Sequence, residues 1–386
     1  MDNKKVALTL TLGALNEAVD TECRVAITPE SAQRLIKAGI QPCIEAGAGM
    51  KAGFQDADYE AVGVKILSKQ DILGKSNAVA YISVPDNKTI SSQSKGSFAV
   101  GLFASLLNKD IAAQFESAGI TALDIALLPR KLSKAQSMDL MTSQASVAGY
   151  KAVLLAANEY PAFLPMMTTA AGTIKPASVL ILGAGIAGLQ AIGTAKRLGS
   201  VVTAYDVRPA SKDEVLSLGA KFLDLAAFGG PDLSAGQGEG GYARELTNEE
   251  KAAQQAAVDK AAATFDIIIT TAQVPGRKPP VLLTKAGVDN LKRGSVIVDV
   301  AASSLGGNVE GSKPEETVIT PNGVKIIGAP NLPSTAPKTA SNLLARNIAD
   351  IISYFVSEGN FEVQEGDELS VLAISGKKVP SQKEAK

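Results

Sequence analysis

Three closely spaced glycines in the middle of the chain restrict its fold more than any other feature. Gly183, Gly185 and Gly188 follow the apolar run SVLIL and open the helical pattern IAGLQAIGTAKRLG. In such a unit the first glycine permits a tight turn, the second admits a pyrophosphate, and the third lets the helix pack on the strand. The helix N-terminus offers N–H groups and a partial positive charge to phosphates. The pattern therefore predicts a strand–loop–helix unit that binds a dinucleotide.

The next apolar run ends in the acidic residue that a dinucleotide-binding unit of this kind requires. VVTAYD ends at Asp206, near the spacing of about 20 residues that is typical of such sites. A carboxylate there accepts hydrogen bonds from the adenosine ribose and repels a 2′-phosphate, which favours NAD over NADP. Arg208 could favour that phosphate, but pairing with a loop carboxylate or solvent is the simpler expectation. FAD fits less well, because its fingerprint usually lies near a chain's N-terminus.

Alternating strand and helix patterns predict an α/β fold with two Rossmann-like, doubly wound parallel-sheet domains and a cleft between them. At 386 residues, two domains are the natural expectation. A long helix over 137–158 links the halves, and a helical segment over 338–355 crosses back. The first domain then comprises 1–140 and 338–386, and the NAD(H)-binding domain comprises 141–337. Strands are expected at 6–12, 42–47, 77–84, 97–103 and 120–128, then at 178–183, 201–206, 221–225, 265–271, 295–300 and 324–328.

Composition excludes several classes of function. The net charge of −1 gives no sign of a nucleic-acid-binding face. Cys23 and Cys43 are the only cysteines and histidine is absent, so neither a metal site nor a disulfide framework is expected. No segment is suited to span a bilayer, and VALTLTL is interpreted as a strand rather than a signal peptide. We expect a cytoplasmic chain that reaches a membrane only through partners.

A glycine-rich stretch, FGGPDLSAGQGEGG over 228–241, lies between two expected sheet elements. Such a loop buries little apolar surface, and long loops in compact domains often act as lids. Tyr242 follows directly and offers an aromatic ring that could cover a bound ligand. A tolerated surface insertion is the alternative.

The segment LPRKLSKAQSMDLMTSQASVAGY (128–150) resembles a loop of the NAD(H)-binding component of proton-translocating transhydrogenases. That family carries Pro-Arg, then Ser-Arg-Ala-Gln-Ser-x-Asp, Ser-Ser and Ala-Gly-Tyr. The resemblance continues through PMMTTAAGT, the glycine motif, YDVRP, GGYA, TTAQVPGRKPP, GSVIVDVA and APNLPS. The first domain matches more loosely, through RVAITPE (24–30) and the stretch 45–63, which alanine dehydrogenases share.

The resemblance implies a set of catalytic residues. Arg130 and Asp139 would hold the carboxamide end of NAD(H), Gln136 would appose it to NADP(H), and Thr142 keeps the hydroxyl of the family's serine. Arg130 lies one residue further from Gln136 than in the family, so Lys131 stays open as the holder of the arginine's role. Tyr242 would belong to a mobile loop. The cofactor-binding residues would be Gly183, Ala184, Gly185, Ile186, Gly188, Asp206, Val207, Arg208, Tyr242, Thr271 and Ala272.

The implied function is that of the alpha subunit of a Si-specific/Re-specific NAD(P)⁺ transhydrogenase. Hydride would pass directly between NAD(H) on this chain and NADP(H) on a partner subunit, coupled to proton translocation by a membrane partner. Only one dinucleotide fingerprint is visible, so NADP(H) must be held by another polypeptide. The family is homodimeric and peripheral to the inner membrane. Direct hydride exchange needs orientation and exclusion of water more than acid–base groups, which suits a chain without histidine.

Two alternatives remain at this point. Alanine dehydrogenases use a lysine and a histidine on a keto acid, but the corresponding strands end in ISVPDN and GLFASLL, and only Arg24 of that pocket is present. A non-catalytic NAD(H)-sensing subunit would keep the glycine loop and Asp206. In such a sensing subunit the segment with Arg130, Gln136 and Asp139 would have no function.

Overall fold

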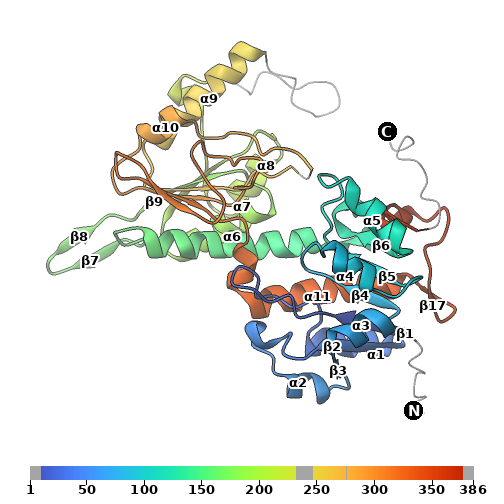
Figure 1. Ribbon diagram of the computed structural model, residues 1–386. Helices are drawn as coiled ribbons and strands as arrows, with labels where there is room; N and C mark the ends of the chain where they lie inside the picture. Colours follow the sequence, from blue (N-terminus) through green and yellow to red (C-terminus); the bar gives the residue numbers. More distant parts are fainter. Residues whose placement is uncertain (1–9, 232–246, 275, 377–386) are drawn as a thin grey trace. The chain divides into compact units, whose positions relative to one another are not determined.

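The computed structural model describes residues 10–231, 247–274 and 276–376 (Figure 1). The chain divides into two compact units. Unit 1 comprises Met1–Gln144 and Pro333–Lys386, and unit 2 comprises Ala145–Leu332. Each unit is built on its own largely parallel β-sheet with helices on both faces.

The sheet of unit 1 has six parallel strands in the order β3-β2-β1-β4-β5-β6. The order reverses between β1 and β4, which is where doubly wound folds usually place their sites. The strands are β1 (Leu10–Ala14), β2 (Ile40–Glu45), β3 (Lys65–Leu67), β4 (Ala78–Ala80), β5 (Phe98–Gly101) and β6 (Thr121–Asp124). The helices are α1 (Pro29–Lys37), α2 (Asp56–Glu60), α3 (Lys69–Lys75), α4 (Asn87–Ser92), α5 (Asp110–Ala118) and α11 (Pro337–Tyr354).

Two hydrophobic layers cover this sheet. On one face α1 and α11 pack against β1 and β2 through buried side chains such as Leu35, Ile348 and Ile352. On the other face α3, α4 and α5 pack through Ile72, Ile90 and Phe115. Helix α11 is therefore part of the core of unit 1, although the whole of unit 2 separates it from β6 in the sequence.

The sheet of unit 2 has the order β11-β10-β9-β12-β13-β15-β14, and only β14 is antiparallel. Its strands are β9 (Ser178–Leu182), β10 (Val201–Tyr205), β11 (Lys221–Phe222), β12 (Ile267–Thr270), β13 (Val296–Asp299), β14 (Thr317–Ile319) and β15 (Lys325–Gly328). Helices α6 (Leu140–Glu159), α7 (Ile186–Arg197) and α8 (Ser211–Ser217) contribute to one face, and α9 (Asn248–Ala262) and α10 (Lys285–Asp289) cover the other.

The expected α/β fold class, with two domains that are each built on a doubly wound, largely parallel sheet, is confirmed, and the departures are local. The strands that were not expected are short: β3, β14, a hairpin formed by β7 (Met167–Thr169) and β8 (Gly172–Ile174), and a hairpin formed by β16 (Val356–Ser357) and β17 (Asn360–Phe361). The long linking helix begins at Leu140 rather than at 137. Residues 133–138 form instead the 3₁₀ helix η3 (Ser133–Met138), which a 3.6-residue pattern cannot distinguish from a first helical turn.

Candidate active site

The three glycines connect β9 to α7 in the way that their spacing predicts. Gly183 has a φ of 98°, which favours glycine, and its carbonyl oxygen accepts a hydrogen bond of 2.9 Å from Thr271 Oγ1. A Cβ on Gly188 would lie 1.9 Å from that same carbonyl oxygen. Only glycine at this position lets α7 approach the turn so closely.

The N-terminus of α7 is open and suited to an anion. Gly185 is the N-cap, and no side chain caps the helix there. A Cβ on Gly185 would meet no atom within 4 Å, so the space in front of the helix is free. Free N–H groups at the start of a 12-residue helix form a favourable site for phosphate. These residues therefore fit the pyrophosphate of a dinucleotide.

Asp206, directly after β10, is tied to the glycine turn and to Arg208. Its Oδ2 accepts a hydrogen bond of 2.7 Å from the N–H of Ala184. Arg208 donates from Nε to Oδ1 at 3.0 Å and from Nη2 to Oδ2 at 3.1 Å. Burial alone would raise the pKa of Asp206, but the hydrogen bonds from Arg208 and Ala184 lower it below its usual value. The carboxylate is thus held ionised beside the glycine turn.

Apolar side chains and one buried amide complete this edge of the sheet. Val207 and Ile186 are 61 % and 44 % exposed, a large apolar exposure that a bound adenosine would reduce.

The side-chain amide of Asn308 is fully buried. It accepts a hydrogen bond from the N–H of Ala272 at 2.9 Å and donates to the carbonyl oxygens of Ala272 and Pro280 at 2.9 and 2.7 Å. Asn308 shapes the loop after β12 that carries Thr271 and Ala272.

Two residues that support this site were missed from the sequence. No pattern marks Asn308, because its partners lie about 30 residues away. Gly149 of α6 lies against α7, and a Cβ there would be 2.0 Å from the carbonyl oxygen of Ala187. The run Ala148-Gly149-Tyr150 carried the family resemblance, but its packing role requires the tertiary structure.

In unit 1, the segment 128–142 brings Arg130, Asp139 and Thr142 together. Arg130 Nε lies 3.7 Å from Asp139 Oδ2. The same carboxylate accepts hydrogen bonds from the N–H of Thr142 at 2.9 Å and from its hydroxyl at 2.7 Å, which caps α6. Asp139 thus lies directly before α6, whose start is delayed by η3. Gln136 is exposed, and Arg130 rather than Lys131 pairs with Asp139.

The guanidinium of Arg24 is already bound by side chains of its own unit. Glu22 accepts from Arg24 Nε at 2.8 Å and from Nη2 at 2.6 Å, and Gln144 Oε1 accepts from Nη1 at 2.9 Å. The arginine and Glu22 side chains are only 11 % and 8 % exposed. A substrate carboxylate would have to displace Glu22, which argues against a keto-acid site at Arg24.

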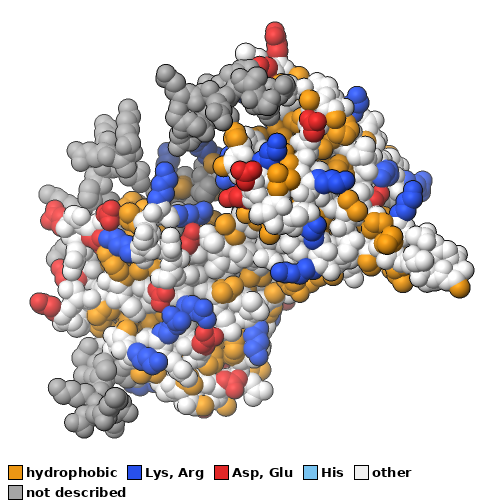
Figure 2. All heavy atoms as spheres, turned by 180° about the vertical axis from the view of Figure 1, so that it is seen from behind, with side chains coloured by type: hydrophobic (Ala, Val, Ile, Leu, Met, Phe, Trp, Pro, Cys, Tyr) orange, Lys and Arg blue, Asp and Glu red, His pale blue; other side chains and the backbone are white. Residues whose placement is uncertain are grey.

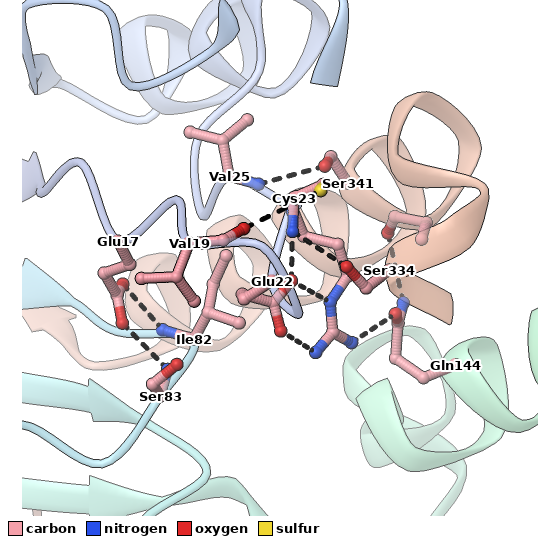
Figure 3. A network of polar contacts seen from close by, with 12 residues as sticks. Glu17, Val19, Glu22, Cys23, Val25, Ile82, Ser83, Gln144, Ser334 and Ser341 are labelled. Carbon is pink, nitrogen blue, oxygen red and sulfur yellow. Dashed lines mark hydrogen bonds and ion pairs between the residues drawn. The ribbon is translucent and has the colours of Figure 1, made fainter. Parts of the chain in front are cut away.

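Glu17 occupies the neighbouring position at the ends of β1 and β4. Its carboxylate accepts from the N–H groups of Ile82 and Ser83 at 2.9 and 2.8 Å (Figure 3). Burial raises the pKa of Glu17 to about 7, against the lowering effect of these two bonds. The switch point of this sheet is therefore filled by the chain's own acidic groups.

Two expectations concern the glycine-rich stretch and the membrane. Tyr242 and the glycine-rich stretch beyond Pro231 lie outside the described residues. No helix within the described ranges is long and apolar enough to cross a membrane.

Comparison with known proteins identifies the family. The models "Alanine dehydrogenase/PNT, N-terminal domain" and "Alanine dehydrogenase/PNT, C-terminal domain" match residues 13–148 and 152–378. The chain belongs to the alanine dehydrogenase/PNT family. In this alanine dehydrogenase/PNT protein the second match extends past unit 2 into α11, which the structure places in the core of unit 1.

Within the family, the chain is more similar to transhydrogenases than to alanine dehydrogenases. It is 41 % identical over 358 residues to an NAD(P) transhydrogenase alpha subunit of Rickettsia prowazekii, covering 91 % of each chain. The crystal structure of transhydrogenase from Sinorhizobium meliloti matches with a TM-score of 0.78 and 36 % identity, over 89 % of this chain and 93 % of that one. An L-alanine dehydrogenase structure matches with a TM-score of 0.72 and 25 % identity, over 89 % of each. The resemblance drawn from the sequence is confirmed.

Proposed function

We propose that this chain is the NAD(H)-binding alpha subunit of a transhydrogenase, which exchanges hydride with NADP(H) on a partner subunit. The observation that carries the proposal is the group formed by Arg130, Asp139 and Thr142, found in a chain that also has a complete dinucleotide turn. An amino-acid dehydrogenase or a sensor has no use for that group. The occupied Arg24 supports the same conclusion.

The residues of unit 2 would bind and orient NAD(H). The α7 N-terminus would hold the pyrophosphate, Asp206 would accept from the adenosine ribose, and Val207 and Ile186 would contact the adenine. The loop bearing Thr271 and Ala272 would lie along the nicotinamide half. When bound, the cofactor gives or takes a hydride at C4 of its nicotinamide, and no proton is exchanged with the ring.

The residues of segment 128–142 would act on the reacting end. Arg130 and Asp139 together offer N–H donors and a carboxylate acceptor, which match the C=O and NH₂ of a carboxamide. Thr142 and Arg130 hold the Asp139 carboxylate in place. Gln136 is exposed beside them and would appose the partner's nicotinamide. Orientation of this kind accounts for a large part of the rate of a direct transfer.

The first test mixes the purified chain with the NADP(H)-binding component of a transhydrogenase. We expect NADPH-dependent reduction of an NAD analogue with a distinct absorbance only in the mixture. Arg130→Ala and Asp139→Asn are each expected to lower kcat about 10- to 100-fold, because misplaced reactants react slowly. The dissociation constant for NADH should change less than about threefold, since unit 2 would supply most of the binding energy.

The matched control is Arg34→Ala, which removes another exposed arginine of unit 1 that pairs with a carboxylate, Asp350, at 3.6 Å. It should leave kcat unchanged. Turnover of pyruvate, ammonia and NADH by the chain alone would contradict the proposal in favour of an alanine dehydrogenase. Tight NADH binding without turnover in the mixture would favour a sensing subunit.

We further propose that the chain is a homodimer that reaches the inner membrane through its partners, where the NADP(H)-binding and proton-channel subunits couple hydride exchange to proton movement. The β7–β8 hairpin supports the dimer. Its six strand residues are all exposed, and large apolar side chains at the hairpin and its base are open to solvent: Phe163 52 %, Met166 63 %, Met167 37 % and Ile174 45 %. In Figure 2 hydrophobic side chains gather at its base, on the right. A two-stranded hairpin alone is marginally stable in water, so a second copy would stabilise it.

The dimer proposal predicts that charge on the hairpin separates the subunits. The double variant Met167→Asp with Ile174→Asp should sediment as a monomer, with the dimer dissociation constant raised at least ~100-fold by two buried charges. Ile319→Asp is the control, because Ile319 is 67 % exposed on the edge strand β14 of the same unit. A dimer that survives the double change, or a monomeric wild-type chain, would contradict the proposal.

A further inference from the structure

Lys134, the second residue of η3, is held by three oxygen atoms from the C-terminal part of unit 1. Its Nζ lies 3.0 Å from Asp367 Oδ1, 3.1 Å from Tyr354 Oη and 3.2 Å from Glu368 Oε2. The ammonium also lies 5.5 Å from the centre of the Tyr354 ring. Tyr354 in turn donates to Asp367 at 3.1 Å. We call Lys134, Tyr354, Asp367 and Glu368 the lysine clamp.

The clamp differs from an ordinary exposed ion pair. Isolated surface pairs contribute little, because two long side chains must be ordered for one contact. Here Asp367 is only 14 % exposed and is also bonded to the N–H of Leu369 at 3.3 Å. Burial acts to raise the pKa of Asp367, but the bond from Lys134 and the others lower it. The Asp367 carboxylate is therefore in place before the lysine binds, whereas the side chain of Glu368 is 62 % exposed.

The C-terminal segment that carries these acceptors is itself fixed to the sheet. Ala373 bridges Leu123 of β6 in an antiparallel sense, and the N–H of Ile374 donates to the carbonyl of Ala122 at 2.8 Å. Leu369 and Leu372 are fully buried in the core of unit 1. The clamp thus ties the exposed side of η3 to a rigid support, while Ala135 and Met138 on its other side are buried in the same core.

The clamped residue stands between the groups assigned to catalysis. Arg130 precedes it, and Gln136 and Asp139 follow it on the same short segment. A second contact fixes the end of this segment, because the side-chain amide of Asn347 in α11 donates a hydrogen bond to the carbonyl oxygen of Ser137 at 2.6 Å. Between Arg130 and Ser137, the polar side-chain contact that anchors the described segment is that of Lys134.

We propose that Lys134 is a positioning residue for hydride transfer, which acts by holding η3 on the C-terminal segment and so sets the orientation of Arg130 and Gln136. The inference rests on the proposed function. The inference extends the proposed function by assigning the C-terminal segment 354–368 a role in catalysis, although that segment supplies no group that touches substrate.

The test combines turnover with a readout that does not depend on activity. Lys134→Met keeps the length and apolar stem but removes the charge, and Lys134→Arg keeps the charge. In the mixture with the NADP(H)-binding component, Lys134→Met should lower kcat about 10-fold with NADH affinity unchanged, while Lys134→Arg retains most of kcat. In the chain alone, amide hydrogens of 132–138 should exchange about 10-fold faster in Lys134→Met.

Two further variants sharpen the interpretation. Asp367→Asn should lower kcat as Lys134→Met does, and the double variant should be no worse than either single one, as expected when both act through one contact. Lys75→Met is the control, because it breaks the exposed Lys75–Asp71 pair (2.6 Å) on α3 of the same unit. It should change neither kcat nor exchange at 132–138.

Each outcome decides the inference. Faster exchange with an unchanged kcat would overturn the positioning role, and unchanged exchange would show that the clamp does not hold η3. Additive losses in the double variant would also contradict it. If the wild-type chain gives no turnover with the partner, the proposed function fails and the inference with it. That result differs from one in which the wild-type chain is active and Lys134→Met is equally active, which would overturn the inference alone.

Discussion

Gly188→Ala is expected to weaken NADH binding at least ~100-fold. The added Cβ would lie 1.9 Å from the carbonyl oxygen of Gly183 and 3.2 Å from Thr271 Oγ1. Because the nearest obstacle is backbone, no side-chain rotation relieves the contact, and either α7 or the turn must move. Both carry the N–H groups that would bind the pyrophosphate. The change therefore acts on binding through the geometry of the turn.

Gly193→Ala is the matched control, because it lies in the same helix and its Cβ would meet no atom within 4 Å. Alanine there should leave NADH affinity unchanged and raise the free energy of unfolding by up to ~1 kcal/mol. Fluorescence titration with NADH and thermal unfolding measure both effects. A Gly188→Ala protein that folds and binds NADH within about threefold of wild type would show that the turn does not hold the dinucleotide.

Asp206→Ala is expected to weaken NADH binding about 10- to 100-fold and to remove most of the preference over NADPH. The carboxylate would accept from the ribose hydroxyls, and charged hydrogen bonds of this kind contribute roughly 1.5–3 kcal/mol. Its loss also removes repulsion of a 2′-phosphate. At the same time it releases the guanidinium of Arg208, which Asp206 now binds at two points. Both changes favour NADPH.

Titration of both nucleotides against the variant tests this expectation. Asp213→Ala serves as control, because it removes an exposed carboxylate of α8 a few residues further on and should not change selectivity. In the double variant Asp206→Ala with Arg208→Ala, the gain in NADPH affinity should disappear. If Asp206→Ala still excludes NADPH, another group of the site enforces the choice of cofactor.

The sequence predicts some elements of the fold better than others. The β9–α7–β10 unit was located with its strand ends to within one residue. Its signals are local, because an apolar strand, three glycines and an acidic residue lie within about 30 residues of one another. The strands β3 and β14 were missed, since three residues give no measurable periodicity. The start of α6 was misplaced because η3 has a similar pattern.

The family resemblance extended the prediction to the site but left one choice open. Spacing alone could not decide whether Arg130 or Lys131 pairs with Asp139, because an inserted residue shifts the alignment. The structure pairs Arg130 with Asp139 at 3.7 Å. The catalytic roles of both residues remain proposals that the turnover experiments test.

The sequence by itself determined the fold class, the position of the dinucleotide turn and the family, because each of these depends on neighbours in the chain. Only the tertiary structure decided that Glu22 and Gln144 bind the guanidinium of Arg24, that Asn308 shapes the loop after β12, and that Lys134 is bound by Asp367. Gln144 and Arg24 are separated by 120 residues, and Lys134 and Asp367 by 233. Such pairs form only when the sheet brings distant segments together, and a polar residue carries no sign in the sequence of the partner that will satisfy it.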